Sequence, residues 1–402
     1  MADSPLLPSQ AAPESGSSPE QEAIADGSVT DVAPAQAPKP PSGSALSRAF
    51  RSRGWQWLGL GITVPFLALN GLAAWQAHSL TKYRSFPEAQ PPLFVQPPLQ
   101  RLWAFATGVQ VPRPENRYSP AELGLAFETY NLDLGGGERL EAWYVPADPG
   151  VLESGQSGSA EVPAQAQDPA QTPAQAKPPK QGMVLLFPAY AASKQTLLQE
   201  IKQFHRLGYD CFAVDFRGVG GSSGSDTTLG RREAEDVAAA VDYVRQRFDN
   251  PPLALYGRLM AAGTVLRAVA EYDLAPAALI LEDPYANLYT LTEASVAAVG
   301  LPRSPTAQML TLWGGVFQGG DPTAFDPITY APAVQSSALV LYGSDGTSWT
   351  TLNDVVGLHS QLAGPKDILG LSSQSMLPLS MTAPGPWLER VGAFLDESLG
   401  NQ

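Results

Sequence analysis

The sequence predicts an α/β fold in which a mostly parallel sheet of eight strands carries helices on both faces. From Gly182 onward, short apolar runs alternate with amphipathic stretches of 12 to 17 residues. The apolar runs are continuous, as is typical of strands that are buried on both faces. Ahead of them, a Gly-Gly-Gly turn at 135–137 joins two further strands as a hairpin.

Each element follows from its own stretch of sequence. The hairpin strands are expected at Ala126–Leu134 and Arg139–Pro146. The later strands are expected at Met183–Phe187, Cys211–Phe216, Leu253–Tyr256, Ala278–Leu281, Ala338–Tyr342 and Ile368–Leu371. The intervening helices are expected at Lys194–Leu207, Arg231–Arg247, Leu259–Glu271, Thr351–Leu362 and Trp387–Leu399. Such alternation favours a sheet covered on both faces.

Composition excludes several functional classes. The chain has 402 residues with 25 basic and 39 acidic side chains, a net charge of -14. This charge argues against a nucleic-acid partner, because neutralising phosphates needs clustered Lys and Arg. Cys211 is the single cysteine, so an intramolecular disulfide and cysteine-based zinc or iron–sulfur sites are excluded. The three histidines, His78, His205 and His359, are scattered, and no metal or other cofactor is expected.

The N-terminal part predicts a single membrane anchor. Residues 1–53 are expected to be a disordered tail, and 54–78 a transmembrane helix. Trp57–Trp75 spans nineteen residues without a charge, about 28 Å as a helix. A buried helix in a soluble protein is the alternative, since Pro65, Asn70 and several glycines weaken the pattern. Three arginines precede the segment while Lys82 and Arg84 follow it, which favours a main domain on the non-cytoplasmic side.

The remaining segments complete the predicted organisation. Residues 79–120 are proline-rich and predict an extended stalk with a short helix near Leu99–Gly108. The main domain is predicted at 121–402. Within it, 148–181 is a low-complexity insertion, expected to be disordered, and 284–330 interrupts the strand–helix alternation as a lid-like insertion.

Two stretches carry a family resemblance. The run DFRGVGGSSG begins the stretch Asp215–Arg245, and LALYGRLMAAG around Leu259 has the form of a strand, a turn and a helix. Together they resemble the α/β-hydrolase family, in particular its serine esterase and serine aminopeptidase-like members, over about 127–399. The resemblance implies a Ser–Asp–His triad in that chain order, a G-x-S-x-G nucleophile turn and an oxyanion hole of backbone N–H groups.

The residues depart from this pattern at each triad position. Leu259 occupies the nucleophile position, and its side chain has neither an acidic proton nor a lone pair. The acid position is Gly346, with Asp345 displaced by one residue. The position of the base falls near Met376, where no histidine is present, and Pro188-Ala189 replaces the usual His-Gly. These departures predict a catalytically inactive protein, a pseudoenzyme.

An active hydrolase with an unorthodox residue set is the alternative. Ser222 or Ser223 would then be the nucleophile and His359 the base. Against this, the serines belong to a small-residue turn and His359 falls within a predicted helix. Cys211 begins an apolar strand and is expected in the core.

A binding pocket is expected to survive the loss of the triad. The backbone N–H groups of Tyr190 and Met260 occupy the oxyanion positions implied by the resemblance. Leu259, Met260 and the segment Tyr285–Leu291 are expected to line an apolar pocket. The sequence therefore predicts a membrane-anchored protein that acts as an accessory or scaffold subunit of a membrane complex, or as a binder of an apolar small molecule. A third possibility places the function in the membrane helix itself, through close helix contacts at its glycines.

Overall fold

The computed structural model describes residues 45–85, 97–148, 182–319, 326–345, 350–373 and 377–400. The chain divides into two compact units, Met1–Leu60 and Gly61–Gln402. The second unit contains the whole β-sheet together with the helices that cover it. Helix α1 (Ala45–Leu80) begins in the first unit and ends in the second.

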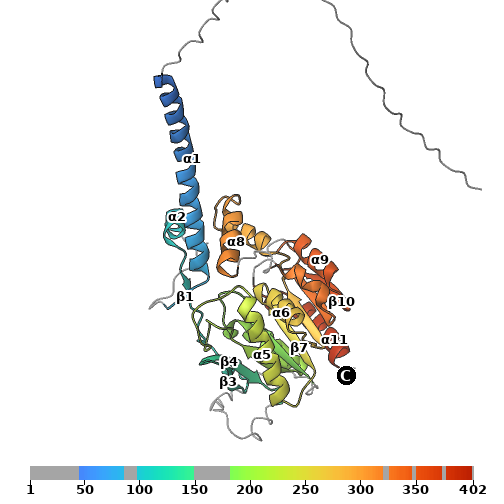
Figure 1. Ribbon diagram of the computed structural model, residues 1–402. Coiled ribbons are helices and arrows are strands. Elements are labelled where there is room, and N and C mark those ends of the chain that lie inside the picture. Colours follow the sequence, from blue (N-terminus) through green and yellow to red (C-terminus); the bar gives the residue numbers. More distant parts are fainter. Residues whose placement is uncertain are drawn as a thin grey trace, which may run out of the picture. The chain divides into compact units, whose positions relative to one another are not determined.

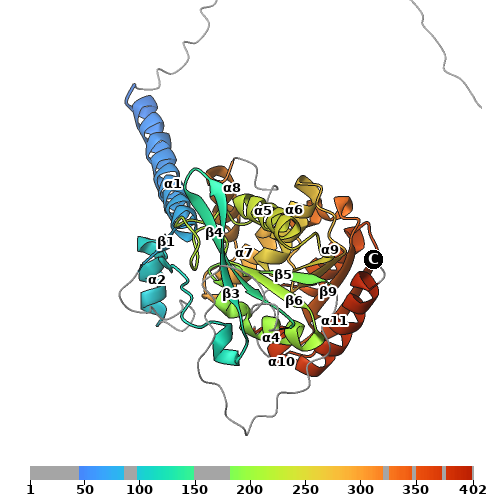
Figure 2. The ribbon, with the colours of Figure 1, turned by 90° about the horizontal axis from the view of Figure 1, so that it is seen from below.

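An eight-stranded sheet forms the centre of the second unit, with the order β10-β9-β8-β7-β5-β6-β4-β3 (Figure 2). Its first two strands in the sequence, β3 and β4, form the predicted hairpin and are antiparallel, and β5 to β10 run parallel to one another. The strands are β3 (Glu128–Gly135), β4 (Glu138–Val145), β5 (Met183–Phe187), β6 (Asp210–Val214), β7 (Leu253–Arg258), β8 (Ala278–Glu282), β9 (Ser337–Gly343) and β10 (Lys366–Leu371). The predicted fold class is confirmed.

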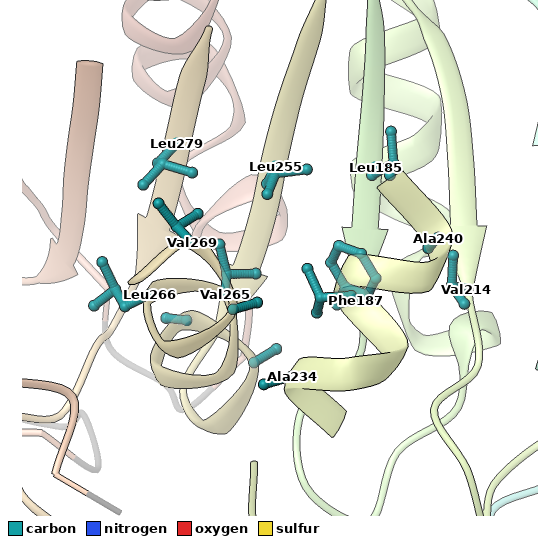
Figure 3. Packing of buried hydrophobic residues seen from close by; sticks show 14 of the residues in the cluster. Leu185, Phe187, Val214, Ala234, Ala240, Leu255, Val265, Leu266, Val269 and Leu279 are labelled. Atoms are coloured by element: carbon teal, nitrogen blue, oxygen red, sulfur yellow. The ribbon is translucent and has the colours of Figure 1, made fainter. Parts of the chain in front are cut away.

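Helices cover both faces of this sheet. Leu185 and Leu255 point to one face, where α5 and α6 pack (Figure 3). Their neighbours Val184 and Ala254 point to the other face, where α4 and α11 pack. This alternation is the two-residue period of a strand, and it explains why the runs had to be apolar throughout. The covering helices are α4 (Leu198–Leu207), α5 (Arg231–Arg247), α6 (Met260–Glu271), α9 (Leu352–Gln361), α10 (Leu379–Thr382) and α11 (Pro384–Leu399).

Two further helices lie between β8 and β9, within the region predicted as a lid-like insertion. They are α7 (Leu288–Ala298) and α8 (Thr306–Phe317). Asn287 caps the start of α7, because its side chain accepts a hydrogen bond from the N–H of Thr290 (2.9 Å). Of the two, α8 stands apart from the helix layers of the sheet (Figure 1).

The predicted transmembrane helix is not supported. Helix α1 includes the predicted 54–78, but among the described residues no helix combines the length and the apolar character needed to cross a bilayer. Pro65 and Asn70 interrupt the apolar run, and its last turns carry polar side chains. Two of these, Gln76 and Ser79, are buried against protein.

The described part of the predicted stalk packs on the domain instead of extending away from it. Strands β1 (Tyr83–Arg84) and β2 (Val111–Pro112) pair in parallel, and helix α2 (Pro98–Thr107) lies between them in sequence. Tyr83 and Val111 are buried in the main core. These apolar side chains dock the described part of the segment on the domain.

A buried ion pair explains the glycine-rich motif after β6. Lys194 and Asp215 are fully buried, and the Lys194 ammonium lies 2.5 Å from the Asp215 carboxylate and 2.7 Å from that of Glu141. Side chains at Gly220 or Gly221 would overlap these two carboxylates, so the turn needs glycine there. The motif that carries the family resemblance thus encloses a structural charge cluster.

Replacing Lys194 by methionine should lower the free energy of unfolding by about 3 kcal/mol, because Asp215 would remain buried without its cation. The control is Lys82→Met, which removes a half-exposed ion pair with Asp226 and should cost less than about 1 kcal/mol. Urea denaturation of both variants measures the difference. Equal losses of unfolding free energy in the two variants would show that the buried ion pair stabilises the fold no more than the half-exposed one does.

Candidate functional site

The turn between β7 and α6 has an unusual backbone. Strand β7 ends at Arg258 and α6 begins at Met260, so Leu259 alone makes the reversal, with φ 52° and ψ -117°. The N–H of Leu259 donates to the carbonyl of Glu282 on the neighbouring strand (3.0 Å). A Cβ at Gly257 would come within 2.6 Å of the backbone of Ala261, so the turn requires glycine at this position. The turn is therefore constrained by the hydrogen bond to β8 and by the close contact between Gly257 and the first turn of α6.

Leucine at this φ is strained, at a cost of about 1–3 kcal/mol. Three more residues with positive φ lie near the turn or the cavity. Asp283 (φ 47°) directly follows β8 and pairs with Arg258. Leu229 (φ 55°) lines the same cavity as Leu259, and Ala191 (φ 53°) follows the cavity residue Tyr190. Strained residues gather at functional sites when the surrounding structure holds them in place.

A cavity of about 470 Å³ opens beside Leu259. Most of its wall is aliphatic and comes from the end of α1, the start of α6, and helices α7 and α8. The residues that line it are Gln76, Leu80, Val109, Ala189, Tyr190, Leu229, Leu259, Met260, Tyr285, Leu288, Leu291, Thr292, Ser295, Val296, Val299, Leu301 and Leu310. The volume falls in the range of small-molecule sites.

Three polar side chains in this wall, those of Gln76, Thr292 and Ser295, already have partners. Thr292 and Ser295 donate to carbonyls of their own helix, each at 2.8 Å. The Gln76 amide donates to the carbonyl of Ala104 (3.2 Å) and accepts from the N–H of Val109 (3.0 Å). Among the described residues, none that lines the cavity carries a charge. The wall therefore suits an uncharged, apolar ligand.

The predicted pocket residues Tyr190, Leu259, Met260 and Tyr285 all lie on this one wall. Met260 is the first residue of α6, so its N–H has no intrahelical acceptor. The Tyr190 hydroxyl donates to the carbonyl of Leu80, the last residue of α1 (2.6 Å). Burial raises the pKa of the Tyr190 and Tyr285 hydroxyls, so both remain neutral.

The predicted acid and base positions are only partly visible. Asp345 follows β9 and is exposed, accepting hydrogen bonds from the hydroxyls of Ser344 (3.0 Å) and Ser372 (2.8 Å). Ser372 lies just after β10, so the loops after these two strands meet. Gly346 and Met376 lie outside the described residues.

The residues of the alternative catalytic set are not brought together at the cavity. Ser222 donates to the carbonyl of Asp215 (2.7 Å), and Ser223 bonds the backbone of Arg139. His359 lies on α9, where burial and the nearby Lys366 lower its pKa, and it does not line the cavity.

Two other residues considered from the sequence lie away from the cavity. Burial lowers the pKa of His205, which lies on α4. Cys211 is fully buried in the core, where burial raises the pKa of its thiol.

A buried charge cluster beneath the turn was not predicted from the sequence. The Arg258 guanidinium lies 3.3 Å from the carboxylates of both Glu282 and Asp283. Glu282 is fully buried and also accepts from Tyr256 (3.1 Å) and Trp387 (3.2 Å). Its sequence signal is a charged residue at the end of each of two apolar strands. We name Arg258, Glu282 and Asp283 the turn cluster.

The strand order and the turn at the end of β7 define an α/β-hydrolase fold. A sequence profile described as "Serine aminopeptidase, S33" matches residues 178–338. Among solved structures, an esterase of Pyrococcus furiosus aligns with a TM-score of 0.54 and 16% identity, covering 72% of this chain and 100% of that one. A second crystal form of this esterase gives 0.52 and 14%, covering 79% and 100%.

Curated relatives share a shorter region. Lysophosphatidylserine lipase ABHD12 of Danio rerio is 31% identical over 94 residues, and that of Gallus gallus is 31% identical over 90 residues. These alignments cover 23% and 22% of this chain and 24% and 23% of those proteins, so the match spans about a quarter of each relative. This chain has the α/β-hydrolase fold and is similar in sequence to α/β-hydrolase proteins over part of its length, in line with its motifs.

The turn cluster should make stability depend on pH. Burial raises the pKa of Glu282 from 4.5 to about 7. Its contribution is therefore fully present below about pH 4.5 and is lost as the pH rises through about 7. We expect the free energy of unfolding to fall over this window, and Glu282→Gln to remove on the order of 3 kcal/mol of that fall.

Urea denaturation at a series of pH values measures this slope. Asp236 provides the reference, because burial raises its carboxyl pKa to about 7 as well and its slope remains in the variant. A slope unchanged by Glu282→Gln would contradict the assignment.

Proposed function

We propose that this protein binds an apolar acyl ligand at the β7–α6 turn and does not cleave it. One observation carries the proposal: the strained turn of a nucleophile is present, but its residue is Leu259 and it borders an uncharged cavity of about 470 Å³. A leucine side chain cannot attack a carbonyl carbon. In this proposal, the backbone of the turn shapes the cavity wall beside Leu259 and does not present a nucleophile.

The wall indicates the ligand class. The aliphatic side chains of α7, of the residues that follow it and of Leu310 on α8 suit a hydrocarbon chain. The N–H of Met260 offers a donor to one carbonyl oxygen beside Leu259. The relatives' names, lysophosphatidylserine lipase and esterase, describe proteins that act on esters. A single-chain acyl lipid with its polar end at the turn is the ligand that these features favour.

The proposal includes membrane association and an accessory role. A protein that holds a lipid without turnover delivers or presents it to another component, which is the basis for an accessory subunit of a membrane complex.

Restoring the missing hydroxyl alone should not restore catalysis. We expect Leu259→Ser to leave turnover of a short-chain chromogenic ester at the level of buffer, because no histidine of the described residues lines the cavity to accept the proton. The wild-type protein and a Ser223→Ala variant are assayed beside it. Wild-type turnover that is lost in Ser223→Ala or His359→Ala would instead establish an active hydrolase.

Filling the cavity should abolish ligand binding. Oleic acid or monoolein should raise the melting temperature of the wild-type protein, since a ligand of the native state stabilises it. Val296→Trp places a large ring in the wall and should weaken binding by roughly tenfold or more. The matched control is Val356→Trp, at an exposed position on α9, which should keep the wild-type shift. An equal shift in all three proteins would place the lipid elsewhere.

A further inference from the structure

Helix α1 leaves its middle exposed on all sides. Every residue from Thr63 to Leu69 is exposed, and none of them is charged. Phe66 is 61% exposed and Leu67 60%. A helix segment that is apolar all round is stable when it is buried in protein or lipid, not when it faces water.

Helix α8 adds apolar side chains next to this segment. The indole N–H of Trp313 lies 3.4 Å from the Asn70 side-chain oxygen, and the ring of Phe317 packs edge-on against His78 (5.6 Å). Figure 1 shows α8 beside α1. The exposed apolar residues of α8 are Leu312, Val316 and Phe317. We name these three, with Val64, Phe66, Leu67 and Leu69, the apolar face.

The apolar face is continuous with the proposed ligand site. Leu310 on α8 lines the cavity, and Leu312 and Phe317 of the same helix are exposed. On α1, Gln76 and Leu80 line the cavity a few turns beyond the exposed Leu69. The same two helices therefore contribute both to the cavity wall and to the exposed apolar surface. A hydrocarbon chain that leaves the cavity along them would meet no charged side chain of the wall.

Charge favours one occupant for this face. The chain as a whole carries -14, but residues 45–85 contain five basic residues and no acidic one. The basic residues are Arg48, Arg51, Arg53, Lys82 and Arg84. In the sequence, these basic residues lie on both sides of the apolar segment, and of them Lys82 pairs with Asp226. Such a segment matches an anionic lipid surface, which attracts basic segments and accepts apolar side chains. A second copy of this protein is acidic as well, but it does not combine negative charge with a hydrocarbon layer as an anionic bilayer does.

We propose that the apolar face inserts into an anionic bilayer surface and brings the cavity to it, so that the acyl ligand enters from the membrane. This inference rests on the proposed function, since it supplies the ligand of that same cavity. The insertion is interfacial: the side chains of the apolar face enter the lipid, and the domain lies on the surface.

The test is sedimentation of the full-length protein with vesicles. One set contains phosphatidylcholine and phosphatidylglycerol in equal parts, and the other only phosphatidylcholine. We expect tighter binding to the anionic set, weakened by salt. Leu67→Glu and Phe317→Glu should each weaken binding by roughly tenfold or more, because a carboxylate is costly in the lipid. The matched control is Leu352→Glu on α9, whose side chain is 55% exposed, and it should bind as the wild type does.

Separate measurements distinguish failure of this inference from failure of the proposed function. Val296→Trp should lose oleic acid binding but keep vesicle binding, and Phe317→Glu should do the reverse when oleic acid is supplied from a cyclodextrin carrier. Circular dichroism and the melting temperature show that each variant is folded. Vesicle binding that is equal in Leu67→Glu, Phe317→Glu and Leu352→Glu would overturn the inference. So would a fall in oligomeric mass on Leu67→Glu without any loss of vesicle binding, because the face would then join two copies.

Discussion

The pairing of Arg258 with two buried carboxylates is the interaction on which the candidate site depends. Arg258 is the last residue of β7, Glu282 is the last of the neighbouring β8, and Asp283 follows it. These contacts join the ends of two strands at the point where the chain must reverse. The backbone bond from Leu259 to Glu282 lies directly beside it. Buried charges are retained at such a cost only where each has its partners, and here every carboxylate oxygen of Glu282 has one.

Leu259 shows what this support makes possible. A strained backbone persists only when its surroundings over-determine it, and the strain in a hydrolase turn normally presents a nucleophile. In this chain the turn presents an isobutyl group to a cavity whose described wall is uncharged. The same backbone geometry instead places Leu259 and Met260 in the wall of an apolar cavity, with Met260 as the first residue of α6. The scaffold and the reacting group are separable, which is why fold alone does not fix function.

The sequence predicts the parts of this structure that depend on local pattern. Met183–Phe187 was recognisable as a buried strand because all five residues are apolar, and the structure has it with the same bounds. The turn was found because LALYGRLMAAG resembles the nucleophile turn of the α/β-hydrolase family, and the structure shows that the turn requires glycine at Gly257. The turn cluster escaped prediction because its members, Arg258 and Glu282, meet only through the pairing of β7 with β8. A charged residue at the end of a strand does not indicate, from the sequence alone, which residue it will pair with.

The uncharged stretch of α1 shows a second limit, because one pattern has more than one physical cause. An apolar helix gives the same uncharged sequence pattern whether its side chains contact a bilayer, a protein core, or first one and then the other. In this structure the cause changes along one helix: Val64–Leu69 are exposed, whereas Ala73, Gln76 and Ala77 are buried. Gln76 is the informative residue, since a buried side-chain amide argues against lipid around that part of the helix. Its hydrogen bonds to two backbone groups, one in α2 and one just after it, account for its burial in protein. The stretch predicted as one membrane span therefore has two parts. Its first part is an exposed apolar segment, and its second part packs on the domain and lines the cavity with Gln76 and Leu80.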